Sequence, residues 1–269
     1  MERPEWAPDS IDIERPSAAR IYDYWLGGSH NFAVDREVAR QVTGLIPDTP
    51  LIMQANRAFL HRAVHHLAET GIRQFLDIGS GIPTLGNVHE VVQKTAPDAR
   101  VVYVDVDPVA VAHSRHILGG SEHVAVIEED LRRPDRILAH PETTRLLDFD
   151  QPVALLLLAV LHFIPDEDDP FAIVTRLQSR LAPGSYVAIS HGTADSLPEE
   201  ASQRWLELFR RTPTPGRPRS RTEVAGFFTG LDMVEPGLVW SPQWRPEHPD
   251  EIGDSPERSA TYVGVGRKG

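Results

Sequence analysis

The stretch from Phe75 to Thr84, FLDIGSGIPT, constrains the fold more than any other part of the sequence. Apolar residues suited to a buried strand surround Asp77, and Gly79 and Gly81 follow at once. A parallel strand that breaks into glycines before a helix is typical of a nucleotide-binding α/β unit. Glycine lets the chain turn sharply and lets a ligand approach the backbone, because no Cβ is in the way.

The glycine spacing departs from the dinucleotide fingerprint G-x-G-x-x-G, whose third glycine would fall at Thr84. The departure weakens a pyrophosphate interpretation and leaves room for a nucleoside ligand without a diphosphate. S-adenosylmethionine (SAM) is the common ligand of that kind. A tight strand–helix turn without any ligand is the alternative for this stretch taken alone.

Composition limits the classes of partner. The 269 residues suffice for one α/β domain plus an extension, or for two small domains. The formal net charge of −12 argues against a nucleic-acid partner, which needs clustered Lys and Arg. The negative charge mildly suits a cationic ligand, although the need to keep the protein soluble is enough to explain it.

The sequence predicts a cytoplasmic protein without a metal site or membrane contact. Cysteine is absent, which excludes disulfides and thiolate metal ligands. The histidine pairs His61/His65 and His65/His66 lack a third ligand. The N-terminal residues contain no apolar targeting core, and the longest apolar run, Pro152–Phe163, is too short for a membrane span.

Residues 1–70, which we call the prelude, predict helices and no strand. We expect helices at 18–26, 35–41 and 49–71, with Ser17, Asp35 and Thr49 as their N-caps. The expected apolar stripe of the third helix is Leu51, Ala55, Phe59, Ala63 and Leu67.

From position 72 onward, strand and helix patterns alternate, which predicts a doubly wound, Rossmann-like sheet. Seven strands are expected, at 73–78, 100–105, 123–128, 152–159, 185–191, 236–240 and 260–266. Helices are expected near 86–95, 108–118, 167–181, 198–211 and 221–229. The Pro- and Arg-rich stretch 211–221 is either a solvated loop or a functional lid.

Ligands of such folds lie at the carboxyl ends of the strands. Asp105 ends the second strand and can accept hydrogen bonds from both ribose hydroxyls, whereas Asp107 precedes a proline and suits a helix cap. Asp130 can accept from the adenine amino group and Leu131 can cover the ring, with Glu128 and Glu129 as rivals of Asp130.

These motifs carry a resemblance. The run from 73 to 266 resembles a class I SAM-dependent methyltransferase: LDIGSGIPT is similar to motif I, VVYVDVDP to motif II, EEDLRRP to motif III and LLLAVLHFIPD to motif IV. IYDYWLGGSHNFAVDREVA, followed by GIPTLGNVHEV, resembles a narrower family of SAM methyltransferases long carried as domain of unknown function 574. The resemblance covers nearly the whole chain.

The resemblance implies a seven-stranded sheet with an antiparallel last strand, and a set of roles. Gly79, Ser80 and Gly81 would pass close to the methionine part of SAM, and Asp77 would face its ammonium group. Asp105 would hold the ribose, with Val106 next to it as a further cofactor-binding residue, and Asp130 with Leu131 would frame adenine. Ala159, Val160 and His162 would line the wall near the sulfonium. Ile82 and Pro83 make the turn stiffer than the general pattern.

Methyl transfer needs position, desolvation and, for a protonated nucleophile, a base. His162, His30 and His191 are the candidate bases, with His162 foremost, and each has a purely structural alternative. Tyr24, Trp25, His30 and Asn31, within 17–34, are expected to form a lid over the substrate; a fixed brace is the alternative. Tyr22 belongs to the same aromatic set, and Arg57 could meet the SAM carboxylate.

The sequence thus predicts an N-terminal helical cap at 1–70 and a methyltransferase domain at 71–269 with a helical insert at about 192–220. The predicted function is methyl transfer from SAM, giving S-adenosylhomocysteine (SAH), to a small-molecule acceptor. A SAM/SAH-binding module without catalysis is the alternative. The missing third glycine and the last strand, TYVGVG, disfavour a nicotinamide-dependent oxidoreductase. Nothing in the sequence predicts the acceptor or the oligomeric state.

Overall fold

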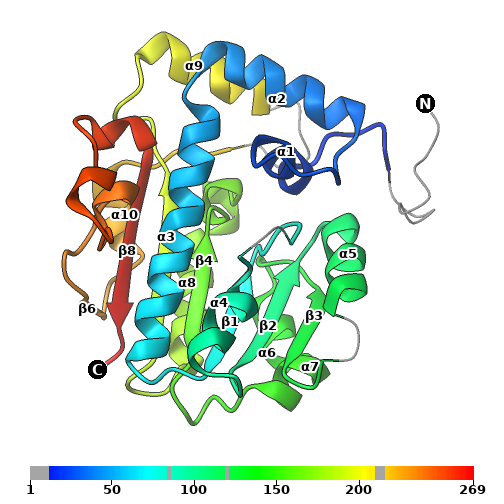
Figure 1. Ribbon diagram of the computed structural model, residues 1–269, viewed down its shortest axis with the longest axis vertical. Helices are drawn as coiled ribbons and strands as arrows, with labels where there is room; N and C mark the ends of the chain where they lie inside the picture. The colour runs from blue at the N-terminus through cyan, green and yellow to red at the C-terminus, as the bar shows by residue number, and fades with distance from the viewer. Residues whose placement is uncertain (1–11, 84–85, 119–120, 210–215) are drawn as a thin grey trace.

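The computed structural model describes residues 12–83, 86–118, 121–209 and 216–269 (Figure 1). A single mixed sheet forms the centre of this part of the chain, in the order β3-β2-β1-β4-β5-β8-β6, with β7 paired to β8. The strands are β1 Gln74–Ile78, β2 Arg100–Asp105, β3 Val124–Glu128, β4 Ala154–Leu158, β5 Tyr186–Gly192, β6 Asp232–Met233, β7 Val239–Trp240 and β8 Thr261–Arg267.

The predicted doubly wound fold is confirmed, with one correction. Strands β1 to β5 are parallel, and β8 runs antiparallel to β5 between β5 and β6. The described residues form eight strands where seven were expected, because two separate two-residue strands, β6 and β7, both pair with β8. Such short strands carry too little pattern to be predicted.

The centre of the sheet is the point at which the chain changes direction. Phe75 of β1 faces Val101 of β2 on one side and Ala154 of β4 on the other. The chain therefore runs outward through β2 and β3 and returns to β4. This reversal opens a crevice at the carboxyl ends of β1 and β4, which is where ligands of open α/β sheets bind.

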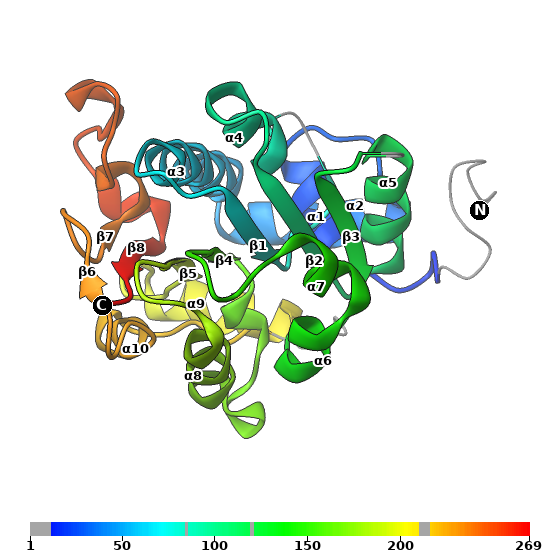
Figure 2. The ribbon, with the colours of Figure 1, turned by 90° about the horizontal axis from the view of Figure 1, so that it is seen from below.

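Helices cover both faces of the sheet (Figure 2). On one face lie α3 Thr49–Glu69, α4 Val88–Thr95 and α5 Pro108–Leu118, and on the other lie α6 Pro134–Ala139, α7 Pro141–Leu146, α8 Pro170–Arg180 and α10 Arg221–Gly226. Alternate residues of each strand enter two separate cores: Leu76 and Ile78 pack on the second face, and Phe75 packs on the first.

The remaining helices lie above the carboxyl ends of the parallel strands (Figure 1). They are α1 Ala18–Trp25, α2 Ala33–Leu45 and α9 Glu199–Phe209, and α2 packs against α9. Segments from the prelude and from the region after β5 therefore meet over the same end of the sheet.

Three details of the prelude differ from expectation. Ser17 precedes α1, but its hydroxyl does not cap the helix and instead bonds to Asp107. Asp35 lies inside the first turn of α2, where it accepts the Phe32 N–H at 2.8 Å. Thr49 begins α3 after Asp48, and its hydroxyl donates to the Ile46 carbonyl.

The predicted apolar stripe of α3 is also partly wrong. Leu51 is 59% exposed, and the buried face begins instead at Ile52, which is 7% exposed. Phe59, Ala63 and Leu67 are buried as expected. The helix therefore presents Ile52, one position further along the chain, to the interior.

Candidate functional site

A cavity of about 700 Å³ lies between the prelude and the carboxyl ends of the strands. This volume falls within the range of roughly 300–1,000 Å³ typical of small-molecule sites. All the cofactor residues expected from the sequence line it: Asp77, Gly79, Ser80, Gly81, Asp105, Val106, Asp130, Leu131, Ala159 and Val160, together with His162. Four separate stretches of sequence therefore converge on one space.

The turn after β1 requires its two glycines. Gly79 has φ +78° and Gly81 has φ +68°, both in the left-handed region that favours glycine. A Cβ at Gly79 would come 2.4 Å from Cγ2 of Val160, so the turn after β1 and the end of β4 approach too closely for any side chain. The Gly79 N–H also donates to the Val104 carbonyl at 2.8 Å, which ties the turn to β2.

The end of β4 is held in an unusual conformation beside this turn. Ala159 has φ +53°, which is strained for a residue with a Cβ. Its N–H lies 2.8 Å from the Ser190 hydroxyl and 3.1 Å from the Ser190 carbonyl, so β5 holds the strained residue in place. Strain of this kind clusters at ligand sites.

Asp105 organises the loops at the end of β2. Its Oδ2 accepts the Gly81 N–H at 2.7 Å and its Oδ1 accepts the Asp107 N–H at 2.8 Å. Burial raises the pKa of Asp105 to about 6, although both hydrogen bonds oppose the shift. Asp105 therefore joins the turn after β1 to the start of α5 in addition to lining the cavity.

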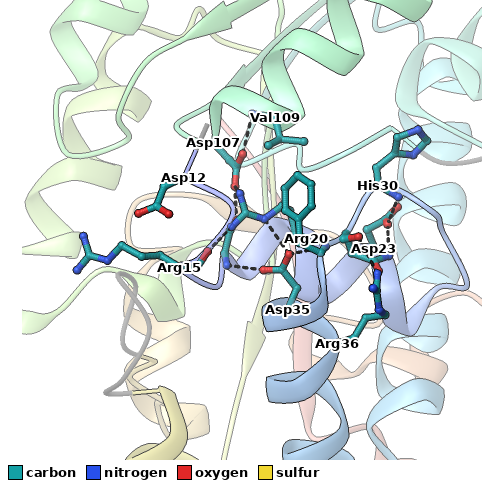
Figure 3. Close-up of polar contacts among 12 residues, drawn as sticks. Asp12, Arg15, Arg20, Asp23, His30, Asp35, Arg36, Asp107 and Val109 are labelled. Atoms are coloured by element: carbon teal, nitrogen blue, oxygen red, sulfur yellow. Dashed lines mark hydrogen bonds and ion pairs between the residues drawn. The ribbon is translucent and has the colours of Figure 1, made fainter. Parts of the chain in front are cut away.

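Asp107 is the cap of α5, as predicted. Its Oδ1 accepts the N–H groups of Val109 at 2.8 Å and Ala110 at 3.4 Å (Figure 3). Its Oδ2 accepts the Ser17 hydroxyl and lies 3.9 Å from Nη1 of Arg20. The cap thus also anchors the prelude.

Arg20 lies with Asp35 and Asp107 in a polar network (Figure 3), which Ser17 joins through hydrogen bonds to both acids and which we call the Arg20 network. Its Nε donates to Oδ2 of Asp35 at 3.0 Å, and both side chains are almost fully buried. Asp35 also accepts the Ser17 N–H at 2.9 Å. Burial raises the pKa of Asp35 against the opposing charge of Arg20.

Asp77 is the most unusual acid of the cavity. It is buried, and no described residue donates a hydrogen bond to its carboxylate. Burial and the charge of Asp105 raise its pKa to about 7, while Arg57 opposes the shift. A carboxylate in this setting is stabilised by a cation brought by a ligand.

The remaining groups test whether the cavity fits SAM. Ser80 Oγ and Asn56 Oδ1 are buried, line the cavity and have no hydrogen-bond partner among the described residues. Val106 also lines the cavity and is 55% exposed, so it offers an apolar surface to a ring. SAM joins an amino acid with a cationic ammonium group to a nucleoside. The buried carboxylate of Asp77 suits the ammonium group, and Ser80 and Asn56 can form hydrogen bonds with a polar ligand. Val106 can contact the nucleoside.

The adenine end is only partly as expected. Leu131 is buried and lines the cavity. Asp130, however, already accepts hydrogen bonds from Arg132, from Nε at 2.9 Å and from Nη2 at 2.5 Å. Burial raises the pKa of Asp130, but these bonds leave it below its usual value. Its rival Glu129 also lines the cavity.

Of the three candidate bases, only His162 lines the cavity. Burial and the nearby charge of Arg219 lower its pKa to about 4, and its Nδ1 accepts the Gly192 N–H at 3.4 Å. His191 is buried between the Gly192 carbonyl at 2.8 Å and Nη1 of Arg219 at 3.2 Å. His30 packs against His113 with the two rings tilted and their centroids 3.5 Å apart, and His30 is not among the described residues that line the cavity.

The expected substrate residues divide in two. Trp25 and Tyr22 line the cavity, and Trp25 donates to the Thr43 hydroxyl at 3.1 Å. Tyr24 and Asn31 do not line it, and the Asn31 amide is bonded to Asp23 at 2.8 Å inside the prelude. Ile52 and Met53 at the start of α3 were missed as lining residues, because apolar residues at a helix start carry no chemical signal.

Two further searches are negative within the described ranges. No group of three or more His, Cys, Asp or Glu side chains there is arranged to hold a metal ion. None of the helices in these ranges has both the length and the hydropathy of a membrane span.

Comparisons with known proteins agree with the geometry. A family model described as S-adenosyl methyltransferase matches residues 4–269. The crystal structure of a DUF574 family protein from Streptomyces avermitilis is similar, with 43% identity, a TM-score of 0.91 and coverage of 96% of this chain and 99% of that one. A candidate methyltransferase from Thermobifida fusca is 39% identical, with a TM-score of 0.92 and coverage of 98% and 99%.

A more distant structure shares the fold alone. The N-methyltransferase NodS from Bradyrhizobium japonicum, solved with SAH, is 15% identical, with a TM-score of 0.51 and coverage of 93% of this chain and 98% of that chain. A comparison of the sequence with curated proteins found no match.

Proposed function

Because this chain belongs to the S-adenosyl methyltransferase family, we propose that it transfers a methyl group from SAM to a small-molecule acceptor bound in the same cavity. SAM is the cofactor and supplies an activated methyl carbon when it is bound. The observation that carries the proposal is the continuity of the cavity. Gly79, Gly81 and Asp105 line one end of it, and it continues past β4 beneath α1 and the start of α3.

The residues around the first turn bind and orient the amino-acid part of the cofactor. Asp77 faces the ammonium group, and the ionic contact compensates the cost of burying its carboxylate. Ser80 supplies a hydroxyl without a present partner. Because Gly79 and Gly81 lack side chains, the ligand can lie against the backbone.

The nucleoside part lies along the ends of β2 and β3 in this proposal. Asp105 accepts from the ribose hydroxyls through lone pairs left over after its two backbone bonds. Val106 and Leu131 contact the adenine ring. Asp130 reaches the adenine amino group only if it exchanges part of its contact with Arg132.

His162 lines the cavity in the short segment that follows β4. With a pKa near 4 it is neutral at physiological pH and too weakly basic to remove a proton readily from an alcohol. We therefore propose that it contacts the acceptor as a neutral hydrogen-bonding group and not as the base that takes up a proton. His191, enclosed by Arg219 and Gly192, supports the wall.

We further propose that the prelude, residues 1–70, is a lid on a catalytic domain of residues 71–269 with an insert at about 192–220. Residues 1–11 of the prelude and 210–215 of the insert lie outside the described residues. Support comes from Ser17, Tyr22 and Trp25, which line the cavity, and from the packing of α2 against α9. A lid excludes water and holds the acceptor in line with the methyl carbon.

Two measurements test the function. Calorimetric titration with SAH, with NAD as the control, is expected to show binding of SAH alone. Incubation with SAM and a library of neutral, acidic and basic small molecules is then followed by mass spectrometry for SAH and a product heavier by one methylene unit. SAH binding without turnover on any acceptor favours the binding module, and NAD binding without SAH binding contradicts the proposal.

A further inference from the structure

The Pro- and Arg-rich stretch 211–221, which the sequence leaves open between a solvated loop and a functional lid, is described by the structure from residue 216 onward. This described part runs beside the segment that follows β4 and carries His162. The Arg217 N–H donates to the His162 carbonyl at 2.6 Å, and Pro218 lines the cavity. The stretch therefore belongs to the surroundings of the candidate site, with a role that the assignment of SAM does not explain.

Arg219 of this stretch has a fully buried side chain. Its guanidinium group donates to the Leu161 carbonyl at 3.1 Å, to the Ile164 carbonyl at 3.0 Å and to Oδ1 of Asp166 at 2.7 Å. These acceptors lie on both sides of His162 in the chain. A guanidinium group is always charged and is costly to bury without partners. The buried cation therefore stabilises one arrangement of this segment, because only that arrangement supplies its acceptors.

A further bond of Arg219 fixes the proton of His191. Nη1 of Arg219 lies 3.2 Å from Nε2 of His191, and because a guanidinium group cannot accept, Nε2 is the acceptor. Burial lowers the pKa of His191 well below its usual value, so the ring is neutral and its single proton lies on Nδ1. Nδ1–H donates to the Gly192 carbonyl at 2.8 Å. Arg219 thus selects one of the two tautomers of His191.

Gly192 connects this pair to His162. Its carbonyl accepts from His191 and from the Arg219 N–H at 3.4 Å, and its own N–H donates to Nδ1 of His162 at 3.4 Å. His162 is neutral, because burial and the charge of Arg219 lower its pKa to about 4. The single proton of its ring therefore lies on Nε2, and none of the described residues accepts a hydrogen bond from that atom.

We propose that Arg219 is a positioning residue, which holds the segment after β4 and, through His191 and Gly192, keeps the proton of His162 on Nε2. His162 then offers an N–H donor to a ligand in the cavity. An oxygen or nitrogen with a free lone pair is the matching group on the acceptor. This last step rests on the proposed function, since it assumes that the acceptor contacts His162, whereas the role of Arg219 does not depend on it.

The wild-type protein tests the proton positions without any change to these contacts. Proton–nitrogen correlation spectra of the full-length protein with nitrogen-labelled histidines distinguish a ring protonated on Nδ1 from one protonated on Nε2. At neutral pH we expect Nε2–H for His162 and Nδ1–H for His191, each in roughly tenfold excess over the other tautomer, as for one hydrogen bond. The signals are assigned by their loss in His162→Gln and His191→Gln. The opposite tautomer, an even mixture or a charged ring at His162 overturns the inference.

Arg219→Met tests the positioning role, with Arg217→Met as the matched control. Both arginines bond to Asp166, at 2.7 Å and 3.0 Å, and Arg219 is the one of the two that also bonds to His191. We expect the excess of the Nε2–H tautomer of His162 to fall to about twofold or less in Arg219→Met and to persist in Arg217→Met. A folded Arg219→Met variant with the wild-type tautomers would show that Arg219 supports only the fold, which overturns the inference.

His191→Phe tests the same connection if Arg219→Met does not fold. Phenylalanine keeps an aromatic ring beside Phe227, on which His191 stacks with centroids 5.9 Å apart. The bonds of Arg219 to the segment after β4 stay in place, and only the two ring nitrogens are lost. We expect His162 to lose its tautomer excess in this variant as well. An unchanged excess contradicts the connection through His191.

Titration with SAH separates this inference from the proposed function. Each protein is titrated before its spectra are recorded. A wild-type protein that does not bind SAH contradicts the proposed function, while its histidine tautomers still report on Arg219. A wild-type protein that binds SAH but has His162 in the other tautomer keeps its cofactor assignment and loses only the positioning role.

Discussion

Asp77 and Asp105 end the neighbouring strands β1 and β2, and the charge of Asp105 adds to the burial that raises the pKa of Asp77 to about 7. Two acids are thus crowded into a buried place where no described residue donates a hydrogen bond to Asp77. Such an arrangement lowers the stability of the free protein and favours a ligand that brings a cation.

Binding of SAH should therefore depend on pH. Below about pH 7 Asp77 carries a proton in the free protein, and that proton must leave when the ammonium group binds. We expect the affinity to rise by about tenfold between pH 6 and pH 8, with proton release at the lower pH. Calorimetry in two buffers of different ionisation enthalpy measures both, and Asp77→Asn should abolish the dependence. An affinity that is flat over this range in the wild type contradicts the role of Asp77.

The same pKa predicts the pH dependence of stability. A carboxyl group whose pKa is raised by folding binds more protons in the folded state, so the free energy of unfolding falls as pH rises from about 4 to about 7. Asp77→Asn should raise the melting temperature of the ligand-free protein at about pH 8 and weaken SAH. Thermal denaturation with and without SAH measures both effects. A destabilised variant would show that the carboxylate has a stabilising partner in the fold.

Asp105 and Asp107 should differ in their effects. Asp105→Ala removes the acceptor of the Gly81 and Asp107 N–H groups and the proposed ribose contact, so the binding of SAH should weaken by about 1–3 kcal/mol. Asp107→Ala removes the cap of α5, which should lower the free energy of unfolding by about 1 kcal/mol. The total loss should be larger, because Arg20 also loses a nearby carboxylate. Titration and denaturation of both variants compare them. Loss of binding in Asp107→Ala alone would reverse this division of roles.

Gly79→Ala tests the close approach of the turn to β4. The added Cβ would meet Val160 at 2.4 Å in a backbone with φ +78°. Gly230→Ala is the control, because Gly230 has φ +82° and open space around it. Both should lose about 1 kcal/mol from backbone strain, and only Gly79→Ala should lose more and bind SAH weakly. Partial recovery is expected in the double variant with Val160→Ala. Equal losses of stability and equal SAH affinity in the two alanine variants would show that the close approach of Gly79 to Val160 is not needed for either.

The Arg20 network should contribute to the stability of the prelude. Asp35→Leu leaves Arg20 buried beside Asp107 alone, which should lower the free energy of unfolding by about 3–5 kcal/mol. Arg20→Met combined with Asp35→Leu should lower it less, as denaturation of both variants measures.

Hydrogen exchange of residues 17–34, measured with and without SAH, distinguishes a lid from a brace. Protection that rises on binding supports the lid, and exchange that is equally slow in both states leaves the brace.

The fold was largely predictable from the sequence because its signals are local. Gly79 has φ +78°, so the turn after β1 favours glycine through its own backbone conformation, and the apolar strands such as β4 carry their own pattern. Asp105 and Asp107 were separable because a proline follows Asp107 directly.

The failures have tertiary causes. Ser17 and Asp35 both have the chemistry of caps, but their side chains contact Asp107 and Arg20, which no local pattern shows. Asn31 was expected at the ligand because its amide is polar, yet Asp23 holds it. Ile52 carries no chemical signal at all, and it is buried with Ala260, a residue far away in the sequence.

The insertion of β8 between β5 and β6 also bears on the order of folding. The lining residues at the ends of β1 to β4 all lie between residues 74 and 165, so this part of the cavity depends on a compact run of sequence. The lining also includes Ala260 and Thr261, at the start of a strand that pairs with β5 some seventy positions earlier in the chain. Closing so long a loop is slow compared with local pairing. During synthesis on the ribosome, the ends of β1 to β4 can thus take shape before β8 completes the cavity at Ala260 and Thr261.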